Sequence, residues 1–411
     1  MRIIDPARLA AYLDLPRTGA PRIVASGNHA TPWRLLEAVD KAVSEYRLFM
    51  LGAQRGIPVR DGVRHETPFV GPGMRGLPTL DYLPARLSLV PRMLATTHKP
   101  DIVLLHVAPP RNKRLSLGIE VNILPAAIEQ CRANGGVVIA QINPLMPATH
   151  GDAQIPLTAV DFAIEAEEPL ASPDKRASAT PEVFARIGER VASMIEDRAT
   201  LQVGIGAVPD AVLAALGRCR DLRVWSEMIS DGIRDLEDAG ALARDAKIST
   251  SFLFGSAELY AWVGGNDRVR MLRTETVNDP SWIASQTAVA SINTALQVDL
   301  YAQANASYVR DRIHSGFGGQ SDFVVGALHS PGGQAIIALP SWHAKTDSST
   351  IVGRLPAPVT SFQHTAIVTE HGRADLIGLS QHEQAANLIE NAAHPEAREQ
   401  LREEAARLGL R

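Results

Sequence analysis

The fold is decided by residues 201–231, LQVGIGAVPDAVLAALGRCRDLRVWSEMISD. The pattern predicts an apolar strand from Leu201, a turn at Gly204-Ile205-Gly206, a helix, and a second strand that ends just before Glu227. Open α/β sheets bind their ligands outside the carboxyl ends of the strands, often beside a helix N-terminus. The stretch therefore predicts a parallel sheet with a pre-positioned carboxylate at its ligand-binding edge.

The composition indicates a globular chain with ample material for a core. The sequence has 411 residues, of which 45% are hydrophobic, and the net charge is −4. This length allows two or three domains, and the charge argues against a nucleic-acid partner. Cys131 and Cys219 are too few for a disulfide framework or a zinc knuckle and fit a reducing compartment. Neither a signal peptide nor a run long enough for a membrane span is visible, so we expect a soluble, cytoplasmic enzyme.

Strand and helix patterns alternate along the rest of the chain. Strands are predicted at 22–26, at 101–108 with an end at Pro109, and at 137–143, and a helix is predicted from Trp33 to Val43. Residues 61–76 are rich in glycine, proline and arginine and are predicted to be a loop. Because such alternation favours parallel sheets, we expect an α/β fold with two similar open domains, mainly parallel sheets, and an active site in the cleft between the domains.

A domain boundary is predicted near residue 180. Residues 167–180, EEPLASPDKRASAT, are charged, contain proline and lack large apolar side chains, as is typical of a linker. A helical pattern follows from Pro181. We therefore expect an N-terminal domain over residues 1–179 and a C-terminal domain over residues 180–411.

A second glycine-rich segment covers residues 315–323, SGFGGQSDF. Its glycines allow the backbone to approach a ligand closely and to expose N–H groups toward an anion, either a phosphate or a developing oxyanion. Phe317 and Phe323 favour an ordered, packed loop over a flexible surface loop.

These features alone leave alternatives open. A glycine pair after a strand also suits a dinucleotide site, although Pro209 opens the helix where the third glycine of that fingerprint would be expected. Glu227 taken by itself is compatible with an ordinary solvated glutamate. An NAD-dependent or nucleotide-binding protein is therefore an alternative at this stage.

Longer motifs distinguish among these alternatives. In order along nearly the whole chain they are FVGPGMR, LGIEVN, QINPLMPATHGD, LQVGIGAVPDAVLAAL, SEMISDGIRDL, VNDP, SINTALQVDL, SGFGGQSDF, AIIALPS, VTEHG and AHPEAREQL. Together they resemble the acetyl-CoA hydrolase/CoA-transferase family, most closely its 4-hydroxybutyrate and butyryl-CoA:acetate transferase type.

The resemblance implies a role for particular residues. Glu227 matches the nucleophile that forms an acyl-glutamyl anhydride and then a glutamyl-CoA thioester. Gly318 matches a segment that supplies an oxyanion donor. The remaining residues implied are Gly204, Ile205, Gly206, Ala207, Val208, Gly316, Gly319 and Lys345 for binding coenzyme A, and Gln202 and His29 for the substrate pocket.

The resemblance also implies the reaction partners. An acyl-CoA and a small carboxylic acid would exchange CoA, and a hydrolase that uses water in place of the acid is the nearest alternative. The implied assembly is a homodimer or homotetramer, with no metal, nucleic acid or membrane partner. His371, Gln363, His364 and Trp342 depart from the family pattern and concern the preference for the acid substrate rather than the chemistry of Glu227.

Overall fold

The computed structural model describes residues 1–13, 19–173, 181–356, 359 and 362–410. The chain forms two compact units. Unit 1 comprises Met1–Asp174, Ile248–Val277 and Ile313–Gly318, and unit 2 comprises Lys175–Lys247, Asn278–Arg312 and Gly319–Arg411. The units are discontinuous in sequence because two later segments join the first one. The domain limits of 1–179 and 180–411 remain a prediction, and residues 174–180 of the expected linker lie outside the described residues.

The main sheet of unit 1 is parallel along its whole path. Its strands, in spatial order, are β1 (Arg2–Ile3), β11 (Phe162–Glu165), β8 (Val137–Ile142), β6 (Ile102–Arg111), β2 (Arg22–Ala25), β3 (Tyr46–Phe49), β4 (Val63–Thr67) and β5 (Leu80–Tyr82). Two short strands, β7 (Arg114–Ser116) and β10 (Gln154–Pro156), pair antiparallel at its margin. The expected mainly parallel α/β architecture is confirmed.

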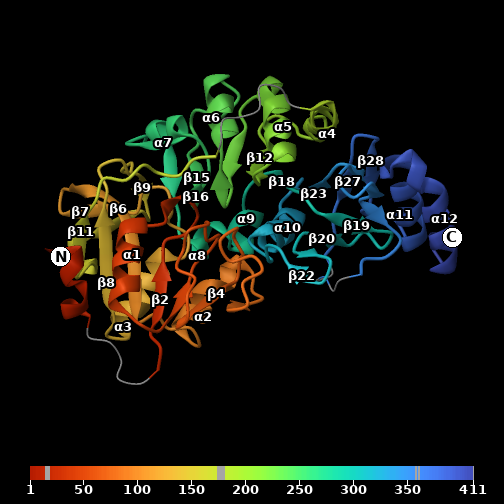
Figure 1. Cartoon of the computed structure of the whole chain (residues 1–411). Coiled ribbons are helices and arrows are strands. Elements are labelled where there is room, and N and C mark those ends of the chain that lie inside the picture. The colour runs from red at the N-terminus through yellow and green to blue at the C-terminus, as the bar shows by residue number, and fades with distance from the viewer. Residues whose placement is uncertain (14–18, 174–180, 357–358, 360–361, 411) are drawn as a thin grey trace. The chain divides into compact units, whose positions relative to one another are not determined.

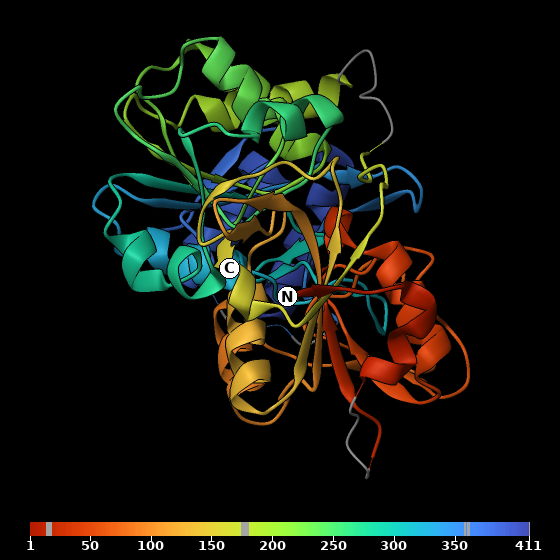
Figure 2. The ribbon, with the colours of Figure 1, turned by 90° about the vertical axis from the view of Figure 1, so that its left-hand side faces the viewer.

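Helices cover both faces of this sheet, and strands buried on two sides explain the continuous apolar runs of β6 and β8. Figure 2 shows the red helices η1 and α1 on one side of the strands and the orange helices α2 and α3 on the other. The helices of unit 1 are η1 (Pro6–Tyr12), η2 (Asn28–Ala30), α1 (Trp33–Ala42), η3 (Leu87–Leu89), α2 (Val90–Ala95), α3 (Leu124–Ala133), η4 (Leu157–Ala159), α7 (Ala257–Val263) and α8 (Thr274–Val277). Unit 1 also contains the parallel strands β15 (Ile248–Thr250), β17 (Val269–Met271) and β9 (His150–Gly151).

Two sequence predictions for unit 1 are wrong. Residues 61–76 are not all loop, because β4 lies within them and pairs with β3. Most of its buried residues are polar: His65 and Glu66 are almost fully buried, and Glu66 is neutralised by Arg22 and Arg47. The strand β6 also continues through Pro109 to Arg111, where it pairs irregularly with β7.

Unit 2 contains the predicted strand–turn–helix–strand stretch. Its main sheet has the order β28 (Arg373–Asp375), β27 (Ala366–Val368), β23 (Gln334–Ala338), β18 (Val289–Asn293), β12 (Thr200–Val203) and β13 (Arg223–Trp225). Only the outer pair of this path, β27 with β28, is antiparallel. Beyond it lie the short strands β14 (Met228–Ile229), β19 (Gln297–Asp299), β20 (Ala304–Asn305), β24 (Trp342–His343), β25 (Ser348–Ser349) and β26 (Ile351–Val352).

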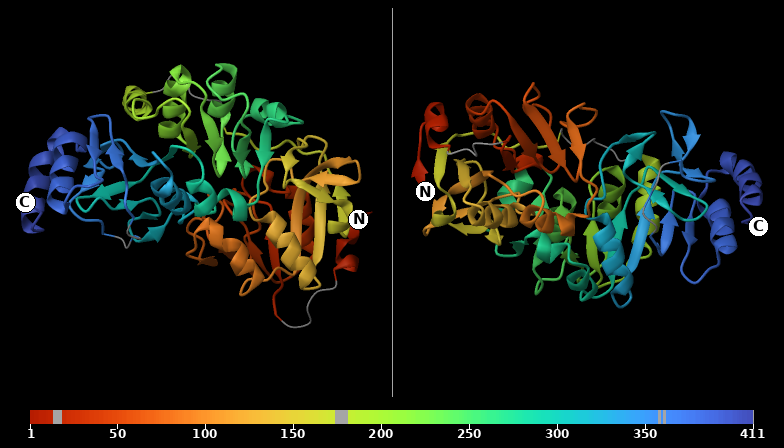
Figure 3. Two further views of the ribbon diagram at one scale, coloured as in Figure 1. Left: turned by 180° about the vertical axis from the view of Figure 1, so that it is seen from behind. Right: turned by 90° about the horizontal axis from the view of Figure 1, so that it is seen from below.

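Figure 1 shows α6, α5 and α4 in a row beside β12, while α10 packs against β18 and β23. The helices α11 and α12 lie beside β27 and β28 in both views of Figure 3 and close a second core around Ile337, Ile367 and Leu388. The helices of unit 2 are α4 (Glu182–Ala192), α5 (Ala207–Ala215), η5 (Leu216–Arg218), α6 (Asp231–Asp238), α9 (Pro280–Ala284), α10 (Gln320–His329), α11 (Gln381–Asn387), the π-helix η6 (Leu388–Ala392), η7 (Pro395–Ala397) and α12 (Arg398–Arg407). Among the described residues, no helix has the length and apolarity to cross a membrane.

Candidate active site

The turn at Gly204 and the carboxylate of Glu227 lie at the same edge of the unit 2 sheet. The strands β12 and β13 are parallel neighbours, with Thr200 opposite Arg223 and Leu201 opposite Val224. The buried hydroxyl of Ser226 joins the two strand ends, since it accepts a hydrogen bond from the Val203 N–H at 3.3 Å and donates one to the Val203 carbonyl at 3.1 Å. This link fixes the residue before Glu227 to the residue before Gly204.

The turn itself presents backbone to solvent. Gly206 is the N-cap of α5 and has φ +113° with ψ −179°, a conformation open essentially only to glycine. A Cβ at Gly206 would meet nothing within 4 Å, and Ile205 is 43% exposed. Ala207 is exposed as well, whereas Val208 is buried. The turn therefore offers an open helix N-terminus, which favours a bound anion.

Glu227 is held by Asn278 and faces Gly319. The amide Nδ2 of Asn278 donates a hydrogen bond of 2.7 Å to Oε2 of Glu227. A Cβ built on Gly319 would lie 1.5 Å from the same oxygen, so only glycine fits beside this carboxylate. Gly319 is also the N-cap of α10. The carboxylate is thus packed against backbone at a helix N-terminus and is oriented by the Asn278 amide.

Asn278 was not among the predicted site residues. It is fully buried and directly precedes Asp279, the N-cap of α9, within the VNDP motif. Its Oδ1 is buried without a hydrogen-bond partner among the described residues. A buried acceptor left unpaired is unfavourable by about 1–3 kcal/mol, so a ligand group that donates a hydrogen bond to this atom would be stabilised.

The predicted glycines Gly316 and Gly318 belong to unit 1 and pack against its loops. A Cβ on Gly316 would lie 2.5 Å from the Pro68 carbonyl oxygen, and one on Gly318 would lie 3.0 Å from the Phe69 ring. The Gly318 carbonyl accepts a hydrogen bond from the Leu87 N–H. The contacts around both residues are therefore those of an ordered loop, and Gly318 directly precedes Gly319 in the chain.

Gln202 of β12 belongs to a buried polar network that it forms with Ser291 and Asn293 of the neighbouring strand β18. Its Oε1 accepts hydrogen bonds from Ser291 Oγ at 2.6 Å and from Asn293 Nδ2 at 3.1 Å. Asn293 also donates to Ser291 Oγ at 2.9 Å. The Gln202 side chain is therefore fixed between β12 and β18, two residues before Gly204.

His29 is placed in unit 1 and is almost completely buried. Its Nδ1 lies 2.8 Å from the Tyr260 hydroxyl, and its ring lies 3.9 Å from the Phe254 ring, centroid to centroid. Burial lowers the pKa of His29 to about 4, so the imidazole is neutral at pH 7.

Lys345 is exposed in the turn between β24 and β25 of unit 2. This hairpin follows Leu339 and Pro340, beyond the carboxyl end of β23. The position is compatible with a contact to a phosphate group, which remains a prediction.

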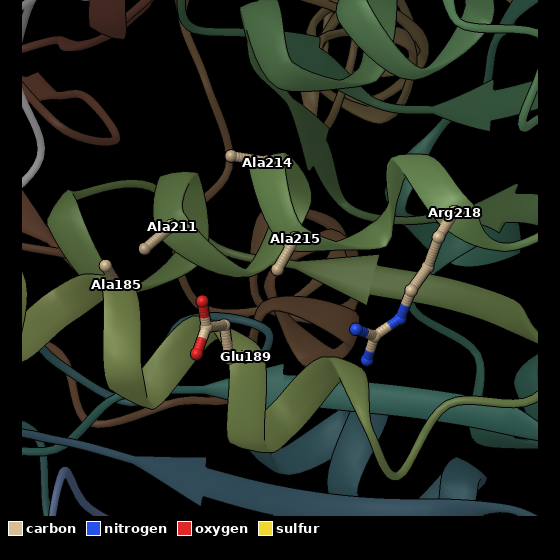
Figure 4. A pocket seen from close by; sticks show the side chains of 6 residues that line it. All are labelled: Ala185, Glu189, Ala211, Ala214, Ala215 and Arg218. Atoms are coloured by element: carbon tan, nitrogen blue, oxygen red, sulfur yellow. The ribbon is translucent and has the colours of Figure 1, made fainter.

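Glu227 lines neither of two cavities in the described part of the chain. Figure 4 shows one of about 310 Å³ along α4 and α5, where the carboxylate of Glu189 and the guanidinium of Arg218 project beside small alanine side chains. The other, of about 570 Å³, lies in unit 1 and is lined mainly by residues 144–148 and 257–265. None of the predicted site residues lines either cavity.

The sequence comparisons establish the family. The acetyl-CoA hydrolase/transferase C-terminal domain matches residues 255–405. The 4-hydroxybutyrate coenzyme A transferase of Clostridium kluyveri is 36% identical over 406 residues, which covers 93% of this chain and 93% of that protein. The chain therefore belongs to the acetyl-CoA hydrolase/transferase family.

Solved structures agree with this assignment over the whole length. RipA from Yersinia pestis is 27% identical with a TM-score of 0.89, covering 100% of this chain and 98% of that one. The 4-hydroxybutyrate CoA-transferase from Porphyromonas gingivalis is 29% identical with a TM-score of 0.80, covering 99% and 98%. Both have the mainly parallel α/β architecture described above.

Proposed function

We propose that this protein transfers CoA between an acyl-CoA and a small carboxylic acid, with Glu227 as the nucleophile. The observation that carries the proposal is the carboxylate of Glu227 held by Asn278 against Gly319, beside the open glycine turn at the carboxyl edge of β12. The family assignment favours a CoA thioester over a dinucleotide as the ligand of this turn.

In the first half-reaction an oxygen of Glu227 attacks the thioester carbonyl carbon. The C–S bond breaks, and the products are an acyl-glutamyl anhydride and CoA thiolate. The thiolate then attacks the glutamyl carbonyl carbon, the anhydride C–O bond breaks, and the original acyl group leaves as a carboxylate. The protein is left as a glutamyl-CoA thioester, with atoms and charge balanced at each step.

In the second half-reaction an acceptor carboxylate attacks the glutamyl-CoA carbonyl carbon. CoA thiolate is displaced, and an anhydride forms between the acceptor and Glu227. The thiolate then attacks the acceptor's carbonyl carbon, which releases the new acyl-CoA and regenerates the Glu227 carboxylate. The overall exchange therefore requires no metal ion and no net proton transfer.

Each step passes through a tetrahedral oxyanion, which requires positioned donors worth about 3–4 kcal/mol each. We assign one donor to Gly318, because it precedes the glycine that faces the Glu227 carboxylate. Asn278 is the second candidate, because its amide already touches that carboxylate.

The remaining predicted residues take the roles of binding and orientation. Gly204 to Val208 would hold CoA at the N-terminus of α5, with Gly316 and Gly319 as neighbouring backbone contacts and Lys345 as a cation for phosphate. Gln202 and His29 are assigned to the acyl pocket. A cytoplasmic location and a homodimeric or homotetrameric assembly also remain predictions.

The decisive experiment is trapping of the covalent intermediate. The protein is incubated with acetyl-CoA alone, treated with borohydride or hydroxylamine, and digested for mass spectrometry. We expect modification at Glu227, and none in Glu227→Ala. The matched control is Glu189→Ala, which removes a glutamate of the α4–α5 cavity and should leave trapping unchanged. Turnover without modification at Glu227 would refute the covalent mechanism.

The acyl acceptor is identified by a separate assay. Free CoA release is measured with acetyl-CoA alone, and formation of new acyl-CoA is measured after addition of butyrate, succinate or 4-hydroxybutyrate. We expect new acyl-CoA to form faster than CoA is released. Fast release without an acid would instead assign the chain to the hydrolases of its family.

A further inference from the structure

Two residues that depart from the family pattern converge on one side chain in unit 2. Trp342 of β24 lies 4.6 Å from the ring of His394, and His371 lies 5.1 Å from the same ring in an edge-on arrangement, centroid to centroid. Because His394 caps η7, the three rings bring together segments that follow β23, β27 and η6. All three side chains remain partly exposed. We refer to Trp342, His371 and His394 as the ring cluster.

The ring cluster lies beyond the same edge of the sheet as Glu227. The strands β23 and β27 end at Ala338 and Val368 and run parallel to β18, which is parallel to β12. Trp342 and His371 follow these strand ends by four and three residues. Parallel strands direct their carboxyl ends to one edge, where α/β sheets bind ligands.

Two arginines act on His371 of the ring cluster, while the nearby acids Glu370 and Asp347 are engaged in hydrogen bonds. Burial lowers the pKa of His371, and Arg398 and Arg186 act in the same direction, against the opposite effect of Glu370. The carboxylate of Glu370 accepts the N–H of Ser341 at 2.8 Å and the Ser341 hydroxyl. The indole N–H of Trp342 donates to Asp347 at 3.0 Å. Glu370, whose Oε1 lies 3.6 Å from His371 Nε2, is therefore the acid that opposes Arg398 and Arg186 at His371, and it is already engaged with Ser341.

Hydrogen bonding also sets the tautomer of His394. Its Nδ1 accepts the N–H of Glu396 at 3.4 Å, so in the neutral ring the hydrogen is on Nε2, which is then a donor. Lys345 lies in the turn of the hairpin whose first strand contains Trp342. An aromatic face, an imidazole donor and a lysine are thus carried by neighbouring segments.

We propose that the ring cluster binds the nucleotide end of CoA, with the adenine stacked on Trp342 and a phosphate bound by His394 and Lys345. Base stacking on an aromatic side chain accepts any purine face, and nearby cations complement the phosphates. This inference rests on the proposed function, because it assigns a subsite for the same substrate.

The test compares substrates that differ only in the nucleotide. Steady-state kinetics of the full chain are measured with acetyl-CoA and with acetyl-pantetheine. Trp342→Ala should raise the KM for acetyl-CoA about tenfold, leave kcat unchanged, and leave the KM for acetyl-pantetheine unchanged. Trp342→Phe keeps an aromatic face and should restore most of the loss. Trp262→Ala, a partly buried tryptophan of α7, is the matched control.

Direct binding distinguishes failure of this inference from failure of the proposed function. Calorimetry with adenosine 3′,5′-bisphosphate should show binding that Trp342→Ala weakens and Trp262→Ala does not, whether or not CoA is transferred. Equal losses with acetyl-CoA and acetyl-pantetheine in Trp342→Ala, or unchanged bisphosphate binding, would refute the nucleotide subsite. Absence of CoA transfer by the wild type, with bisphosphate binding intact, would refute only the proposed function.

Discussion

The side-chain amide of Asn278 donates a 2.7 Å hydrogen bond to Oε2 of Glu227, although 51 residues separate them in the chain. The bond fixes the position of Oε2 and so orients the whole carboxylate. A hydrogen bond from a neutral amide to a carboxylate is of the charge-assisted, stronger kind, so it is suited to holding the proposed nucleophile in place.

Removal of this donor should slow the reaction without abolishing CoA binding. A hydrogen bond to a charged group contributes about 1.5–3 kcal/mol, so Asn278→Ala should lower kcat roughly 10- to 150-fold. Asn278→Asp should lower it further, because two carboxylates would then share one site. Stopped-time assays of kcat and KM check this, with the exposed Asn391→Ala as control. A change confined to KM would contradict the assigned role.

The close packing of Gly319 against the Glu227 carboxylate can be tested by adding a methyl group at position 319. In Gly319→Ala the added Cβ would occupy the position of Oε2 of Glu227 and would also lie 2.4 Å from Nδ2 of Asn278, so both side chains must move. We expect activity to fall by at least about 100-fold, since small displacements of reacting groups have large effects on rate. Gly217→Ala is the matched control, because its Cβ would meet nothing within 4 Å. Retained activity in Gly319→Ala would show that Glu227 adopts another rotamer during catalysis.

The buried ion pairs that Glu66 of β4 forms with Arg22 and Arg47 should be essential to the stability of unit 1. Burial opposes ionisation of Glu66, but hydrogen bonds from Arg22 and Arg47 keep its pKa below the usual value. Removing one partner of a buried pair leaves an uncompensated charge, so Glu66→Ala should lower the free energy of unfolding by about 3 kcal/mol. Urea unfolding measures this. Glu37→Ala, which breaks the exposed pair with Lys41, should produce no measurable change.

His364 predicts a loss of stability in acid. Burial lowers its pKa to about 4 from a usual 6.5, so the unfolded chain binds the proton more tightly. The stabilising contribution is complete above pH 6.5 and is lost as the pH falls toward 4, by up to about 3 kcal/mol. Unfolding midpoints at pH 7 and 4.5 should therefore differ less in His364→Asn than in the wild type. The comparison isolates His364, because the other buried groups, such as His29 and His106 with pKa values lowered to about 4 and Glu120 with a pKa raised to about 7, are the same in both proteins. An unchanged difference would mean that His364 titrates normally in the fold.

Elements that bury mainly apolar side chains could be predicted from the sequence, whereas β4, which buries mainly polar side chains, was missed. The runs at Leu201 and Leu222 with glycines between them led directly to β12, α5 and β13. The strand β4 has few apolar residues because Glu66 is neutralised by arginines from β2 and β3, and His65 bonds to Thr79 and the Pro58 carbonyl. No local pattern reveals such partners.

The candidate active site likewise depends on contacts between distant segments that no local sequence pattern reveals. Glu227 and the turn at Gly204 could be placed from local pattern and resemblance, since each is defined by its own strand. Asn278 could not be selected as its partner, because the contact depends on the path of the chain between β13 and α9. The rings of Trp342, His371 and His394 were likewise brought together only by tertiary structure.

The network of Gln202, Ser291 and Asn293 has a consequence for how the proposed acyl pocket can change. Each of the three side chains supplies a donor or acceptor that another one uses, on two adjacent strands at 4%, 0% and 9% exposure. Replacing any one of them alone leaves a buried polar atom of another without a hydrogen-bond partner. If the acyl pocket is here as proposed, altered substrate choice should therefore arise through matched pairs or triples of substitutions, and a library that randomises single positions should sample many destabilised proteins.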